Sequence, residues 1–139
     1  MRRDPLTPND GEQQKWHRLT LMPESTPGEV LARAETEPTS PWYSGHFPGE
    51  PILPGIAQIA MVGEAIGLAE DRPVRIAGLK RVRFKQVIQP GDGIDIRVRP
   101  REGDAAAYSF QVTVGGEVAC SGIITLAGAG GRESARPQR

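Results

Sequence analysis

The sequence predicts an α+β domain in which one central helix is wrapped by an antiparallel β-sheet. Its 139 residues fit one compact domain. A single helix-length apolar segment lies in the middle of the chain, and segments of strand length lie on both sides of it. One buried helix combined with a run of antiparallel strands is typical of α+β folds rather than of parallel α/β folds.

The strand assignments follow from alternating apolar and polar residues. The clearest alternation is Ile94, Ile96 and Val98 against Asp95, Arg97 and Arg99, which predicts a half-buried strand. Glycine and proline mark the turns, at Pro90-Gly91-Asp92-Gly93 and, as the strongest hairpin signal, at Gly115-Gly116. The predicted strands cover residues 16–22, 29–35, 74–87, 94–99, 108–114 and 118–126.

The predicted helix covers residues 55–69 and is apolar on nearly every side. Such a helix is expected to be buried around most of its circumference. Gly63 and Gly67 lie four residues apart within it. They weaken the helix intrinsically but allow another backbone to approach closely.

The remaining segments are predicted to be irregular. Residues 1–14 and 127–139 are polar and rich in glycine or proline, so we expect flexible tails around a folded domain at residues 15–126. Residues 38–54 contain five prolines. Each proline fixes its own backbone angle and restricts the preceding residue, so no regular element is expected there.

Composition excludes several classes of function. The formal net charge is zero, but the charges are unevenly distributed: the segment from Arg72 to Arg101 contains nine basic residues and only two acidic ones. We interpret this segment as solvated strand faces, with a basic patch for an acidic carrier protein or a phosphate-bearing arm as the alternative. The zero net charge gives no reason to expect a nucleic-acid partner. No membrane partner is expected either, because the longest apolar segment, residues 56–69, is too short to span a bilayer.

Cysteine content and the N-terminus predict a cytoplasmic location. Cys120 is the single cysteine, which we expect to be buried and reduced. The N-terminus begins with basic residues, but no apolar run of a secretory signal follows.

The segment from Gly45 to Gln58 contains the main candidate catalytic residues. In this segment a histidine, His46, lies on a proline-rich loop that leads into the predicted helix. Backbone N–H groups at a helix start lack internal partners and lie at the positive end of the helix dipole. They suit the stabilisation of a thioester oxyanion, and a neutral imidazole suits removal of the α-proton. The segment therefore predicts proton abstraction next to an acyl thioester carbonyl.

This segment resembles the signature of the hotdog-fold 3-hydroxyacyl-acyl carrier protein dehydratases. The matching residues are His46-Phe47-Pro48-Gly49, Pro51 and Pro54-Gly55, and Val87-Ile88-Gln89-Pro90-Gly91-Asp92 is similar to a second family feature. The resemblance implies a hotdog fold, a catalytic His46, and an active site at a dimer interface where the loop of one subunit faces the helix of its partner. We expect Phe47, Pro54, Gly55, Gln58 and Ala60 to contact the substrate.

The sequence departs from the family pattern at one position. Five residues after Gly55, where the family has a helix Glu or Asp, this chain has Ala60. A methyl group cannot protonate a leaving hydroxyl. Glu64 follows one helical turn later on the same face and is the candidate replacement acid. The alternative is that Glu64 has no catalytic role and pairs with an arginine or lines a wet interface.

Other residues are assigned structural roles. His17 is interpreted as a structural or surface residue, and Trp42 and Tyr43 as core residues or pocket wall. Two separated histidines and scattered acidic residues show no metal-ligand spacing. Neither a metal nor a cofactor is expected.

Three functions are compatible with these observations. The first is dehydration of a 3-hydroxyacyl thioester, carried by acyl carrier protein or coenzyme A, to the trans-2-enoyl thioester in fatty-acid or related lipid biosynthesis. The second is a non-catalytic or partner-dependent hotdog subunit that binds acyl thioesters, and the third is an acyl thioesterase. We expect a homodimer or larger assembly, or a hetero-oligomer with a second hotdog subunit, because a single curled sheet leaves an edge strand exposed.

Overall fold

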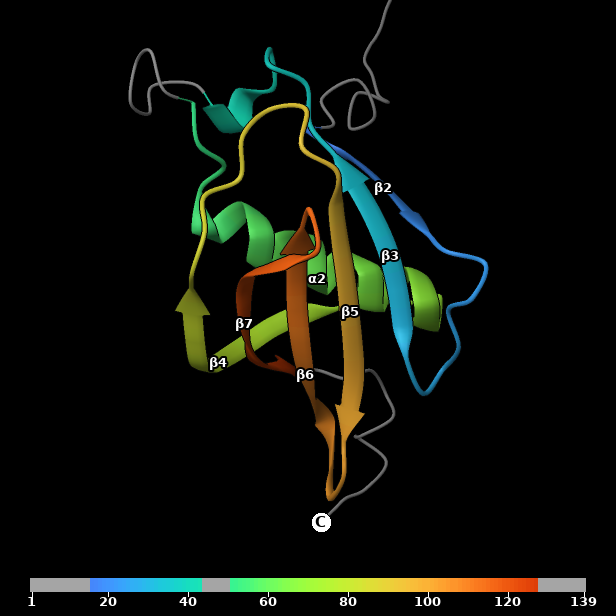
Figure 1. The fold of residues 1–139 in the computed structure, drawn as a ribbon. Coiled ribbons are helices and arrows are strands. Elements are labelled where there is room, and N and C mark those ends of the chain that lie inside the picture. The colour runs from blue at the N-terminus through green and yellow to red at the C-terminus, as the bar shows by residue number, and fades with distance from the viewer. Residues whose placement is uncertain (1–15, 44–50, 128–139) are drawn as a thin grey trace, which may run out of the picture.

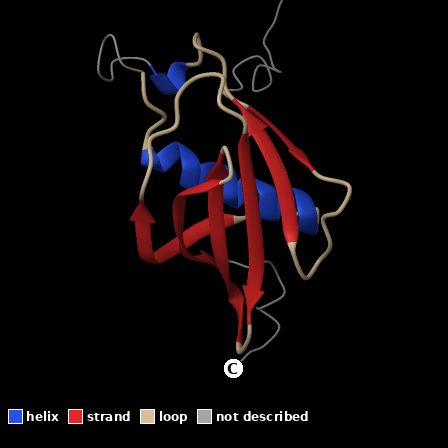
Figure 2. Ribbon diagram, in the orientation of Figure 1, coloured by secondary structure: helices blue, strands red, loops and turns tan. Residues whose placement is uncertain are grey.

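The computed structural model describes residues 16–43 and 51–127. They form one long helix packed against one face of a six-stranded antiparallel sheet (Figures 1 and 2). The predicted α+β hotdog architecture is therefore confirmed. The strand order across the sheet is β2-β3-β5-β6-β7-β4, so that β2 and β4 are the two edges. The elements are β2 (Arg18–Leu21), β3 (Val30–Glu35), the 3-10 helix η1 (Pro41–Tyr43), α2 (Gly55–Glu70), β4 (Arg75–Phe84), β5 (Ile94–Arg101), β6 (Asp104–Val114) and β7 (Glu117–Ala127).

The sheet separates an apolar face from a charged one. On β5, Ile94, Ile96 and Val98 are buried against α2, and the intervening residues are exposed, as the alternation predicts. Burying each such side chain contributes about 1.5–3 kcal/mol. The apolar face therefore determines the side on which the helix packs.

The charged face is partly neutralised by its own ion pairs. Arg97 and Arg99 both contact the carboxylate of Glu29, at 3.1 and 2.9 Å, and Arg33 lies 3.5 Å from Asp95. These pairs join β5 to β3 or to the residue just before β3. Exposed pairs of this kind contribute about 0–1 kcal/mol each. This arrangement agrees with solvated strand faces.

The hairpin between β6 and β7 forms at Gly115-Gly116, as predicted. Both glycines have positive φ, 62° and 85°, which is the backbone that a tight two-residue hairpin turn requires. β6 begins at Asp104, four residues before the predicted start at Tyr108. The extra length pairs with the end of β5, where Arg101 lies opposite Asp104.

Two sequence predictions are corrected. Within the proline-rich connection, residues 41–43 form η1, because Pro41 presets a helical φ and the Ser40 hydroxyl accepts a hydrogen bond from the N–H of Trp42 at 3.2 Å. Ala127, predicted as the first tail residue, is the last residue of β7 and pairs with Arg75.

Cys120 is completely buried, and burial raises the pKa of its thiol to about 11. It is therefore protonated and unreactive at neutral pH. No helix in the described part of the chain has the length and apolarity needed to cross a bilayer.

Candidate active site

The start of α2 presents unpaired backbone donors. Pro54 precedes the helix in an extended conformation and provides no side-chain cap. Its carbonyl accepts hydrogen bonds from the N–H groups of Ala57 and Gln58, at 3.0 and 3.4 Å. Within residues 16–43 and 51–127, the N–H groups of Gly55 and Ile56 have no partner, as expected in a first helical turn. Together with the positive end of the helix dipole, they can stabilise negative charge on a carbonyl oxygen.

The position of this helix start is determined by buried neighbours. Leu53 and Ile88 are both fully buried, and the Leu53 N–H donates to the Ile88 carbonyl at 2.7 Å. The ring of Phe84, from the end of β4, lies against Gly55. A Cβ at Gly55 would come within 2.6 Å of the ring, so a side chain there would displace Phe84. Glycine thus allows β4 to close over the first turn of α2.

A groove of about 730 Å³ runs along the outer side of α2, between the helix and the segment that leads into β4. Small residues line its helix side, namely Ala60, Gly63 and Gly67, and Glu64 contributes the carboxylate. At Gly63 an added Cβ would meet the side chain of Ile76 at 3.4 Å. Because Gly63 and Gly67 have no side chains, the groove stays open between the helix and the segment before β4. Ala60 and Glu64 line the same groove.

Glu64 is hydrogen-bonded to a histidine. Its Oε1 lies 2.6 Å from Nε2 of His17, and Nδ1 of the same imidazole accepts a hydrogen bond from Nε1 of Trp42 at 3.2 Å. The His17 side chain is 14% exposed and that of Glu64 is 31% exposed. Among the described residues, the partner of Glu64 is therefore this histidine and not the arginine considered from the sequence. His17, predicted to be a structural or surface residue, is a mostly buried partner of Glu64.

Gln58 lies on the buried side of α2, with 3% of its surface exposed. Its Oε1 is buried and has no hydrogen-bond partner among the described residues. An unpaired buried acceptor costs about 1–3 kcal/mol. The Gln58 Oε1 can therefore accept a hydrogen bond from a group outside the described residues.

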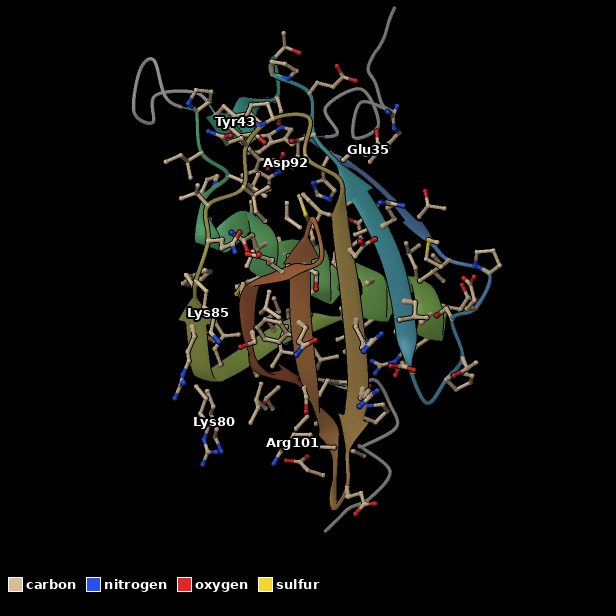
Figure 3. All side chains as sticks on the ribbon, viewed as in Figure 1. Glu35, Tyr43, Lys80, Lys85, Asp92 and Arg101 are labelled. Carbon is tan, nitrogen blue, oxygen red and sulfur yellow. The ribbon has the colours of Figure 1, made fainter. Side chains whose placement is uncertain are left out.

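A buried hydroxyl pair anchors the chain at the end of η1. Tyr43 and Thr36 are both buried, and their hydroxyl groups form a short hydrogen bond. Burial raises the pKa of Tyr43, the Thr36 hydrogen bond opposes the rise, and the nearby Asp92 adds to it. Figure 3 shows Tyr43 and Asp92 close together at one end of the molecule. The Thr36 carbonyl also accepts a hydrogen bond from the N–H of Gly91 at 3.2 Å, which connects the end of β3 to the Pro-Gly-Asp turn.

The predicted site residues that the structure describes lie on or just before α2, but only two of them, Ala60 and Glu64, line the groove. Pro54 and Gly55 form the helix start, Ala60 and Glu64 line the groove, and Gln58 faces the interior. His46 and Phe47 lie outside the described residues. Sequence analysis missed the link from His17 and Trp42 to Glu64. His17 is 47 residues from Glu64, and no local pattern signals a contact over that separation.

Comparison with known proteins gives a consistent family. The model of the ApeI-like family, described as ApeI dehydratase, matches residues 23–123. A 3-hydroxyacyl-(acyl-carrier-protein) dehydratase FabZ from Shewanella woodyi is 34% identical over 115 residues, which cover 73% of this chain and 75% of the relative. The same enzyme from Polynucleobacter asymbioticus is 35% identical over 114 residues, covering 75% and 76%.

Solved structures show the same fold at lower identity. The dehydratase heterocomplex ApeI:P from Xenorhabdus doucetiae superimposes with a TM-score of 0.67 at 24% identity, covering 78% of this chain and 97% of that one. A hypothetical thioesterase from Streptococcus pneumoniae, solved with coenzyme A, has a TM-score of 0.61 at 9% identity and covers 78% and 84%. Both similarities are evidence of fold.

Proposed function

The chain belongs to the ApeI-like family of dehydratases, and we propose that it converts a 3-hydroxyacyl thioester to the trans-2-enoyl thioester. The α-carbon loses a proton to a base, and the electron pair of that C–H bond forms the new double bond. The bond from C3 to oxygen breaks, and the departing hydroxyl takes a proton from an acid and leaves as water. The proton held by the base then returns to the acid, so that the site is restored without a cofactor.

The observation that carries this proposal is the pair of N–H donors at Gly55 and Ile56, which have no partner in the described part of the chain. They lie in the first turn of α2, and the groove runs along the outer side of the same helix. A thioester carbonyl bound at these donors would gain hydrogen bonds as its oxygen becomes negative. We assign the base to His46 and the acid to Glu64, with Phe47, Pro54, Gln58 and Ala60 in contact with the substrate. Fatty-acid or related lipid biosynthesis is the proposed pathway class, by analogy with the FabZ relatives.

We expect purified protein to form enoyl product from a 3-hydroxyacyl group loaded on acyl carrier protein. The measurement is the ultraviolet absorbance of the conjugated thioester, with product identity checked by mass spectrometry. The same acyl group on coenzyme A serves as the comparison, because it shares the thioester but lacks the protein carrier. Release of free acid without enoyl product would identify a thioesterase and contradict the proposal.

A partner-dependent subunit is the second candidate, and Ala60 favours it. A chain that lacks the family's acid at this position would need that group from another subunit if Glu64 does not provide it. The structural similarity to a dehydratase heterocomplex motivates adding a second hotdog subunit from the same genome to the assay. Activity that requires this addition would support the second candidate.

We also propose that a second copy of the chain, or a related hotdog subunit, covers β4. This edge strand is exposed along most of its length, and Figure 3 shows Lys80 directed away from the body of the molecule. Six large apolar side chains are exposed on β4, just after it and on α2: Ile76, Leu79, Phe84, Val87, Ile56 and Leu68. An apolar edge of this kind favours strand pairing or packing with another chain.

We expect a dimeric mass in solution at micromolar concentration, measured by analytical ultracentrifugation. Leu79→Lys should shift the protein toward the monomer, because it places a charge in the apolar edge. Thr20→Lys, on the opposite edge strand β2, is the matched control and should leave the mass unchanged. A monomeric wild-type protein would rule out the homodimer.

A further inference from the structure

Three side chains from separate segments form a hydrogen-bonded series that ends on Glu64. The indole N–H of Trp42, in η1, can only donate a hydrogen bond. It points at Nδ1 of His17 from 3.2 Å, so this nitrogen is the acceptor and carries no proton. The proton of the neutral imidazole is therefore on Nε2, 2.6 Å from Oε1 of Glu64. His17 is the donor and Glu64 the acceptor in that contact.

The series is held in place by the packing around it. The ring of Trp16 lies edge-on to that of Trp42, with centroids 4.7 Å apart, and the imidazole of His17 lies nearly parallel to the indole at an interplanar angle of 21°. The Ser40 hydroxyl donates to the carbonyl of Trp16 at 2.6 Å and accepts from the N–H of Trp42 at 3.2 Å. The imidazole therefore has little freedom to rotate or to exchange its two nitrogens.

This geometry determines where an additional proton can be held. On Nδ1 of His17 it would confront the N–H of Trp42, and two donors would face each other without an acceptor between them. On Glu64 it meets no such conflict. Because Oε1 accepts the His17 N–H, Oε2 is the oxygen of Glu64 that is left for such a proton. Among the described residues Glu64 has no other hydrogen bond, and its side chain lines the groove.

We propose that His17, with its tautomer set by Trp42, is a positioning residue that orients Glu64 so that the acid proton resides on Oε2. The proposal rests on the proposed function, in which Glu64 protonates the leaving hydroxyl. It adds that this acid depends on a histidine far away in sequence. His17 does not itself touch the substrate.

The kinetic test compares two substitutions at position 17. His17→Phe removes the donor and keeps a flat ring, and it should lower kcat about 10- to 100-fold with little change in KM, the scale expected when a reacting group is misplaced. His17→Gln retains an N–H donor and should recover most of that loss. In a Glu64→Gln background, His17→Phe should have no further effect, because the two residues act as one unit.

A purely structural role would give a different pattern. His17→Phe and His17→Gln would then lower activity equally, and His17→Phe would cost the same factor with or without Glu64. Either result overturns the inference. Unfolding midpoints of all variants distinguish loss of fold from loss of catalysis.

A second measurement does not depend on activity. Nitrogen NMR of the imidazole reports which ring nitrogen is protonated, and the chain has two histidines, so His46→Ala assigns the signals. We expect Nε2–H for His17 in this protein, and loss of this preference in Trp42→Phe, which keeps an aromatic ring but removes the indole N–H. A proton on Nδ1 would overturn the inference. Correct tautomers in a protein without dehydratase activity would show instead that the proposed function, and with it the catalytic role of His17, is wrong.

Discussion

Replacing His46 with alanine should lower turnover by about two to four orders of magnitude, the usual contribution of a general base. The imidazole is the proposed acceptor of the α-proton, and alanine provides no group that can take its place. The measurement is the steady-state rate of enoyl formation from one 3-hydroxyacyl carrier substrate.

Folding is expected to change little, because His46 belongs to a proline-rich connection and not to a predicted strand or helix. The unfolding midpoint and the solution mass of His46→Ala are therefore the controls. A well-folded variant with unchanged turnover would exclude His46 as the base.

Replacing Glu64 with glutamine should reduce dehydration to near background. The amide keeps the size of the side chain and removes the acidic proton, and loss of a general acid usually costs about two to four orders of magnitude. Glu70→Gln is the matched control on the same helix, because the Glu70 carboxylate binds Tyr108 at 2.5 Å and Arg72 rather than the His17 imidazole. Its turnover should stay close to that of the unmodified protein.

The reciprocal variant, Ala60→Glu, distinguishes a replacement acid from a degenerate site. Ala60 and Glu64 line the same groove, so a carboxyl group at position 60 can serve the same bound substrate. If the unmodified protein is inactive and Ala60→Glu gains a measurable rate, the site has lost its acid and the partner-dependent function is favoured. Full activity that is indifferent to Glu64→Gln would contradict both assignments, and the proton would have to come from water or from His46.

The main elements were predictable because their signals are local. The alternation at Ile94, Ile96 and Val98 determines which face of β5 is buried, whatever the rest of the chain does. The pair Gly115-Gly116 favours a tight hairpin by backbone freedom alone. Element ends were less predictable, since the first residues of β6 are held by cross-strand pairing with β5 and not by their own pattern.

In the candidate site too, the local features could be predicted from the sequence and the long-range contacts could not. The spacing from Pro54 to Glu64 is a property of one helix, so the sequence by itself determined that Ala60 and Glu64 share a face and that free N–H donors lie at Gly55. Only the tertiary structure decided what Glu64 contacts. Its partner His17 is brought to α2 from the segment just before β2, and Trp42 from η1, and their partly buried rings lie nearly parallel to each other. Contacts over 47 residues depend on how the chain closes around its core, and no local pattern contains that information.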